Sequence, residues 1–179
     1  MMPLRAVGLA WIFFWAVVPS VGAWAGDRVA APLRAWDGIV SAPLFADIAD
    51  FERNVRQEAG ERVYAFLARD AAGGLALSIA VAIAPAGSRL PAANWQAAVA
   101  ATDPATRARD FPQIGARARA EAPRFSPDGA LSGVTFVTSD GFFDVVVSVF
   151  EESGSMVRLP LTAEDAARRI DAAYDASRE

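Results

Sequence analysis

The chain of 179 residues contains no cysteine, no histidine and no lysine, so its 17 basic residues are all arginine. Without histidine and cysteine it lacks Ser-His and Cys-His nucleophile pairs, the usual zinc sites, His- or Cys-ligated haem and iron–sulfur clusters. Without lysine it lacks a Schiff-base amine, and without cysteine it forms no disulfide. No segment has the Asp-x-Asp-x-Asp-Gly spacing of a calcium loop. We therefore expect neither a metal nor a cofactor.

The first 25 residues have the pattern of a secretory signal peptide. A short start with one positive charge, Arg5, precedes an apolar run at 6–18 and an A-x-A cleavage sequence at 23–25. An uncleaved membrane anchor is the alternative, since the segment approaches the roughly 20 residues that a membrane-spanning helix needs. Pro19 and the small residues after it favour cleavage after Ala25, with no stable membrane insertion afterwards.

Cleavage removes 25 of the 179 residues and leaves 154, with a formal charge of −5 because Arg5 is lost from a chain of charge −4. A chain of this length buries roughly 70% of its unfolded surface without needing disulfides, so we expect residues 26–179 to form a single domain. The abundance of alanine and the exclusive use of arginine resemble the codon bias of a GC-rich bacterial genome. Together with the leader, this predicts a periplasmic or secreted bacterial protein.

Two segments after the leader are assigned from local pattern. Residues 26–40 contain Pro32 and Gly38 and no sustained period, which predicts an irregular entry segment. Residues 41–60 are predicted to be a helix, because their large apolar residues follow the spacing i, i+4, i+7, i+11 of one helical face. These residues are Leu44, Ile48, Phe51 and Val55.

A β-hairpin is predicted next, with strands at 62–69 and 75–84 and paired glycines in the turn between them. In the second strand the odd positions from Leu75 to Ile83 are large and apolar, and the even positions are alanine or serine. A strand without charge on either face is expected in the centre of a sheet.

The rest of the chain is predicted to contain both helices and strands. The predicted elements are a helix at 91–101, strands at 116–124, 131–138 and 142–151, and a helix at 163–177 with a capping box of Thr162 and Asp165. Segregated hairpins with few crossovers indicate the α+β class. We expect an antiparallel sheet of about five strands, a hairpin plus a three-stranded meander, with helices packed on it.

The densest group of basic residues lies at 107–124. On a strand, Arg117, Arg119 and Glu121 share one face while alanines occupy the other. Arg117, Arg119 and Arg124 are therefore the candidate residues of an anion-binding site, because guanidinium groups match phosphate and carboxylate oxygens. The simpler alternative is an edge strand whose charged face is solvated, which discourages aggregation.

Carboxylates are the main remaining candidates for acid–base catalysis. Asp144 interrupts the apolar run at 142–150, which makes it a candidate functional acid. An aspartate at such a position more often faces solvent or pairs with an arginine. Adjacent Glu151 and Glu152 point to opposite faces of a strand and do not act together on one substrate.

These observations favour an exported, non-catalytic binding or accessory protein of the bacterial cell envelope. Its expected partner is another envelope protein or a small anionic ligand. Nucleic acid is a poor candidate, because the chain is acidic overall. One alternative is a hydrolase that uses two carboxylates. Another is an inhibitor or assembly factor that pairs an edge strand with another protein.

Overall fold

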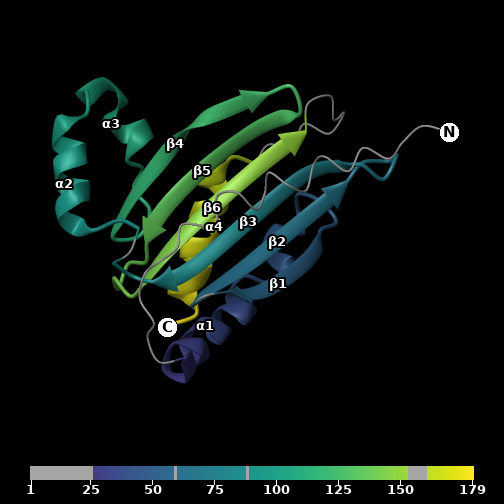
Figure 1. The fold of residues 1–179 in the computed structure, drawn as a ribbon, viewed down its shortest axis with the longest axis horizontal. Helices are drawn as coiled ribbons and strands as arrows, with labels where there is room; N and C mark the ends of the chain where they lie inside the picture. Colours follow the sequence, from purple (N-terminus) through teal and green to yellow (C-terminus); the bar gives the residue numbers. More distant parts are fainter. Residues whose placement is uncertain (1–25, 59, 88, 153–160) are drawn as a thin grey trace.

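The computed structural model describes residues 26–58, 60–87, 89–152 and 161–179, so the expected leader lies outside the described residues. The fold is α+β, with an antiparallel sheet in the order β1-β2-β3-β6-β5-β4 (Figure 1). Its strands are β1 (Glu52–Glu58), β2 (Glu61–Arg69), β3 (Leu75–Pro85), β4 (Arg117–Ser126), β5 (Gly129–Val137) and β6 (Phe143–Glu152). The helical elements are α1 (Gly26–Ile39), the 3-10 turn η1 (Ala42–Phe45), α2 (Ala92–Ala101), α3 (Pro104–Asp110) and α4 (Ala163–Ala176).

The sheet consists of two three-stranded meanders that meet in its centre. β1, β2 and β3 form the first meander, β4, β5 and β6 form the second, and β3 pairs with β6 between them. The predicted central position of β3 is therefore confirmed. The α2–α3 pair connects the two meanders and lies beside β4 at one end of the sheet (Figure 1).

The main core lies between one sheet face and the helices α1 and α4, which pack behind the sheet in the view of Figure 1. Alternate large side chains of β3, including Ile79 and Val81, are fully buried in it. Trp36 of α1 stacks on Tyr174 of α4 with ring centroids 4.5 Å apart, and Phe143 of β6 meets Trp36 edge-on at 5.4 Å. These rings fix both helices against the same face.

The prediction of an irregular segment at 26–40 is wrong, because these residues form α1. Leu33, Trp36 and Val40 lie at the spacing i, i+3, i+7 and are buried against the sheet. The free energy gained by burying these three side chains exceeds the cost of the backbone hydrogen bond that Pro32 cannot donate. Pro32 and Gly38 are exposed and therefore do not disturb the packing.

The predicted helix at 41–60 is also wrong, because the segment contains η1 and then strand β1. Val55 pairs with Tyr64 and Arg53 with Phe66 across β1 and β2, so alternate residues of β1 face the core. Phe45, which is outside the predicted helical stripe, is fully buried. The predicted α+β fold with an antiparallel sheet is confirmed, and among the described residues β1 adds a sixth strand to the five that were predicted.

The other predicted elements are confirmed to within two residues at each end. At the start of α4 the Thr162 hydroxyl accepts the Asp165 N–H at 3.1 Å, and the Asp165 carboxylate accepts the Thr162 N–H at 3.2 Å. This is the predicted capping box. Within the described residues, no helix is both long and apolar enough to cross a membrane.

Candidate functional site

A groove of about 840 Å³ lies on the open face, which we define as the sheet face opposite α1 and α4 (Figure 1). Its volume falls in the range of small-molecule sites. The groove runs over β4, β5 and β6 and reaches the loop after β3. Its described lining residues are Glu61, Arg89, Leu90, Arg119, Ala120, Glu121, Ala122, Pro123, Arg124, Leu131, Ser132, Gly133, Val134, Thr135, Val146 and Ser148.

Two of the three candidate arginines line this groove from the edge strand β4. Arg119 pairs with Thr135, and Arg124 pairs with Leu131, both on β5. Thr135 and Leu131 are four residues apart on one strand, so they point to the same face. Regular alternation along β4 would place Arg119 and Arg124 on opposite faces. A β-bulge between Glu121 and Arg124 supplies the extra residue that brings both arginines to the open face.

The floor of the groove combines apolar side chains with hydroxyl groups. Leu131 and Val146 provide the apolar part, and Thr135 and Ser148 provide the hydroxyls. Gly133 has no side chain, so it leaves a hollow in this floor. A Cβ added at Gly133 would lie 3.8 Å from its nearest neighbouring atoms, so a side chain would fit there without a clash. The floor therefore suits a ligand with an apolar body.

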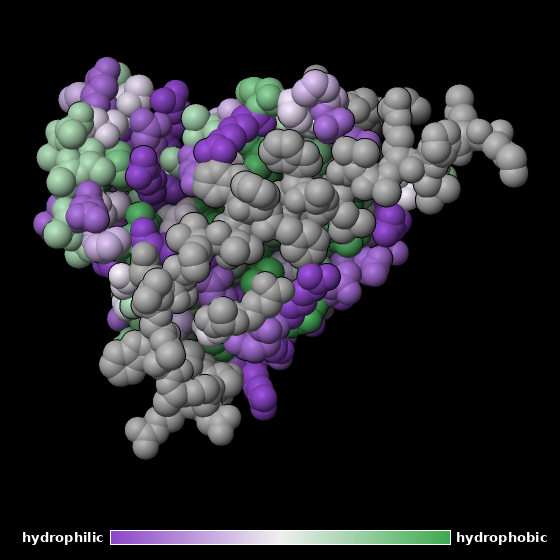
Figure 2. All heavy atoms as spheres, viewed as in Figure 1, coloured by the Kyte–Doolittle hydropathy of each residue, from purple (hydrophilic) through white to green (hydrophobic). Residues whose placement is uncertain are grey.

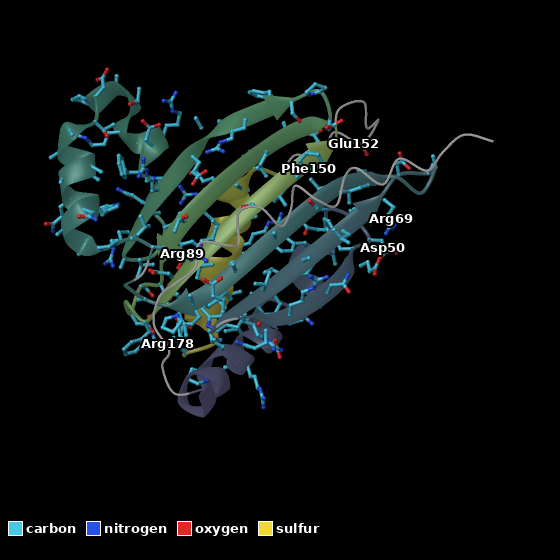
Figure 3. All side chains as sticks on the ribbon, viewed as in Figure 1. Asp50, Arg69, Arg89, Phe150, Glu152 and Arg178 are labelled. Carbon is cyan, nitrogen blue, oxygen red and sulfur yellow. The ribbon has the colours of Figure 1, made fainter. Side chains whose placement is uncertain are left out.

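The end of the groove near the loop after β3 is closed by an ion pair. Arg89 Nη2 lies 2.6 Å from Glu61 Oε1, and both side chains are largely buried. Figure 3 shows Arg89 at this end of the sheet, with Phe150 and Glu152 at the opposite end of β6. The pairing neutralises Arg89 and holds Glu61, and Glu121 is the other carboxylate among the described lining residues.

Asp144 supports this end of the groove from beneath the loop. The side chain is fully buried, and its Oδ2 accepts the backbone N–H of Arg89 at 2.9 Å and of Gly87 at 3.1 Å. The carboxylate therefore fixes the loop that carries Arg89. Asp144 neither lines the groove in the described structure nor faces solvent, and its position is that of a structural aspartate.

Arg117 is separated from the other two candidate arginines. Its Nε donates to the carbonyl oxygen of Leu90 at 2.7 Å, which ties β4 to the segment before α2. It lines a second cleft, between the α2–α3 pair and the end of the sheet. The three arginines that the sequence groups together therefore line two different hollows of the surface.

The edge-strand alternative for this segment is correct as to position, since β4 is the outermost strand on its side. Arg119 and Arg124 are exposed, and hydrophilic residues follow this margin of the sheet (Figure 2). Part of the edge is covered, because Trp95 Nε1 of α2 donates to the Ala118 carbonyl at 3.1 Å. A charged margin on an edge strand discourages aggregation.

The described lining of the groove has Arg119 and Arg124 on one rim and two carboxylates, of which Glu61 is paired with Arg89. Within the described residues, no group of three potential metal ligands comes together. The arrangement can bind an anionic group by charge-assisted hydrogen bonds and can cover an apolar body on the floor. No protein-family model matches this sequence, and no curated protein matches it either.

Proposed function

We propose that this protein is an exported, non-catalytic binding protein of the bacterial cell envelope, and that its groove binds an amphipathic carboxylate. One observation carries this proposal. The bulge in β4 turns Arg119 and Arg124 toward the same groove, whose floor is formed by Leu131, Val146 and the Gly133 backbone. A guanidinium rim above an apolar floor matches a molecule with a carboxylate at one end and a hydrocarbon chain at the other.

Charge and shape contribute separately to this recognition. Both guanidinium groups lie at the exposed rim, so each contributes at the lower end of the range for hydrogen bonds to charged groups, about 1.5 kcal/mol, or roughly tenfold in Kd. Apolar atoms covered by the floor add about 25 cal/mol for each Å² removed from water. A ligand with only one of these two parts should bind weakly.

The test is isothermal titration calorimetry of the purified protein with three matched probes. Decanoate has both parts, acetate has only the carboxylate, and decyltrimethylammonium has the same chain with the opposite charge. We expect decanoate to bind and the other two to bind at least tenfold more weakly. Equal binding of decanoate and decyltrimethylammonium would contradict the role of the arginines.

Three variants separate the two contributions. Arg119→Gln/Arg124→Gln should weaken decanoate binding by at least tenfold, because it removes both positive charges from this rim of the groove. Arg34→Gln, an exposed arginine on α1 behind the sheet, removes a positive charge at a distance and should leave Kd unchanged. Gly133→Val should weaken binding without removing any charge, because the new side chain occupies the floor and the Gly133 backbone does not need a positive φ.

The hydrolase alternative makes a different prediction for the same site. A hydrolase that uses two carboxylates should convert a glycoside such as 4-nitrophenyl β-glucoside, and Glu121→Gln should abolish the turnover. Our proposal expects no turnover above that of the buffer, and expects Glu121→Gln to bind decanoate more tightly because a negative charge leaves the groove. Enzyme-dependent release of 4-nitrophenol that Glu121→Gln removes would replace the binding proposal with the hydrolase.

A further inference from the structure

A second cleft, of about 890 Å³, lies between the α2–α3 pair and the nearby end of the sheet. It is separate from the groove on the open face, and its described lining shares no residue with that groove. One wall is aromatic, from Trp95 of α2 and Phe111 after α3. The cleft is further lined by Arg107 of α3, Arg117 of β4 and Arg168 of α4.

The aromatic wall is built by helices that bury little of their own surface. Within the described structure neither α2 nor α3 has a fully buried residue. Trp95 and Phe111 are half-buried and meet edge-to-face with ring centroids 6.4 Å apart. The Trp95 indole is fixed by its hydrogen bond to the Ala118 carbonyl. The cleft therefore presents rigid aromatic surface that remains partly in contact with solvent.

The three arginines are held in place by backbone carbonyl groups. Arg107 Nη2 donates to Thr102 O at 3.1 Å, and Arg168 Nη1 donates to Gln113 O at 3.0 Å. Arg117 Nε donates to Leu90 O at 2.7 Å. A carbonyl fixes a guanidinium without cancelling its charge and leaves its other N–H groups as donors.

The charge of the cleft is therefore positive. Its described lining includes no carboxylate, and two carboxylates lie against it. Glu164 Oε1 lies 2.7 Å from Arg168 Nη2, and Asp171 Oδ2 accepts the backbone N–H of Gly115 at 2.9 Å. Three cations against these two carboxylates leave an excess of positive charge beside the aromatic wall. An anion whose body is flat and aromatic satisfies both features, because it stacks on the rings and accepts hydrogen bonds from guanidinium groups.

We propose that this cleft is a second binding site, which takes an aromatic carboxylate between the aromatic wall and the three arginines. The site is independent of the groove on the open face in both position and ligand shape. Its ligand is planar and compact, whereas the groove takes an extended hydrocarbon chain.

The test is isothermal titration calorimetry of the purified protein with 2-naphthoate. The matched probes are 2-naphthylmethanol, which has the same rings without charge, and inorganic phosphate, which has charge without rings. We expect 2-naphthoate to bind at least tenfold more tightly than either probe, from one or more charge-assisted hydrogen bonds of about 1.4 kcal/mol or greater. This comparison uses only the unaltered protein, so it does not depend on the folding of any variant. Equal affinity for 2-naphthoate and 2-naphthylmethanol would overturn the proposal.

Two variants then locate the site. Arg107→Gln should weaken 2-naphthoate binding roughly tenfold. Arg109→Gln is the matched control on the same helix, since Arg109 is 76% exposed, pairs with Asp110 and does not line the cleft. It should leave the affinity unchanged. Equal effects of the two variants would show nonspecific attraction to positive charge and would refute the site.

A final comparison distinguishes the cleft from the groove. Arg119→Gln/Arg124→Gln should retain binding of 2-naphthoate while it loses binding of decanoate. If this double variant loses 2-naphthoate and Arg107→Gln does not, both ligands use the groove and the second site does not exist. If 2-naphthoate binds as expected and decanoate binds nowhere, the cleft proposal stands and the groove proposal fails.

Discussion

Removing the hydroxyl of Tyr64 should destabilise the protein in a pH-dependent way. Tyr64 of β2 is fully buried, and its hydroxyl donates to Asp37 Oδ1 of α1 at 2.9 Å. The same carboxylate accepts Arg62 Nε at 3.0 Å and Arg62 Nη2 at 2.5 Å. This cluster connects α1 to the sheet. Tyr64→Phe preserves the ring and its packing and removes one hydrogen bond to a charged group.

The expected loss at neutral pH is about 1.5 kcal/mol. Hydrogen bonds to charged groups contribute about 1.5 to 3 kcal/mol, and the Asp37 side chain is 40% exposed, so water compensates part of the loss. Phenylalanine leaves no donor behind, which keeps the cost at the lower end of that range. In a chain of this length, 1.5 kcal/mol lowers Tm by about 3 to 6 °C.

The pH dependence follows from the charge of Asp37. Burial opposes its ionisation, but the hydrogen bonds from Arg62 and Tyr64 outweigh burial and lower its pKa below the usual 3.8. A carboxylate with a lowered pKa in the folded state stabilises the protein above its unfolded pKa, and this contribution is lost as pH falls through the folded value. The difference between Tyr64→Phe and the parent should therefore shrink in acid.

Urea unfolding of the parent and of Tyr64→Phe gives the free energy of unfolding of each protein. Repeating it at neutral pH and at about pH 3 gives the loss of stability and its dependence on pH. We expect a loss of about 1.5 kcal/mol at neutral pH and a smaller one in acid. An equal loss at both pH values would mean that the hydroxyl does not stabilise the ionised form of Asp37. No loss at neutral pH would mean that the hydrogen bond itself does not contribute to stability.

Three further substitutions test the core, the last helix and a buried carboxylate. Ile79→Asp places an unpaired charge at a fully buried position of the central strand, and the cost of several kcal/mol approaches the whole stability of a typical domain. Circular dichroism should show loss of the folded structure. An unchanged melting curve would contradict the central position of β3. Thr162→Ala removes the hydroxyl of the capping box and should cost about 1 kcal/mol in urea unfolding, whereas an unchanged midpoint would exclude a role for the cap. Burial raises the pKa of Asp171, whose Oδ2 accepts the Gly115 N–H at 2.9 Å, so its ionised form opposes folding above the unfolded pKa. Asp171→Asn keeps an acceptor and removes the charge, and its unfolding free energy should exceed that of the parent at neutral pH; a lower value there would contradict this assignment.

The fold was predictable from sequence where each element carries its own signal. The alternation in β3, the Asp140-Gly141 turn and the capping box of α4 are local features, and the structure contains all three. α1 and β1 lack such signals. In α1, Pro32 and Gly38 indicate irregular structure rather than a helix. In β1, Val55 is the single large apolar residue, so the partners Tyr64 and Phe66 on β2 determine which face of β1 is buried.

The candidate site was predictable only in part, because alternation along one strand is visible in the sequence whereas pairing between distant segments is not. Alternation places Arg117 and Arg119 on one face, and the structure agrees with this through their pairing to Val137 and Thr135. The bulge that turns Arg124 to that face has no simple sequence signal beyond the nearby Pro123. The ion pair of Arg89 with Glu61 joins residues 28 positions apart, which no local pattern reveals.

The central claim is that Arg119 and Arg124 bind an anionic head group above an apolar floor, and the most direct measurement is the Kd of decanoate for four proteins. These are the parent, Arg119→Gln/Arg124→Gln, Gly133→Val and Arg34→Gln. Our account predicts weaker binding for the first two variants and the parent's Kd for Arg34→Gln. The account would be contradicted if decanoate did not bind the parent, or if Arg34→Gln weakened binding as much as the double variant.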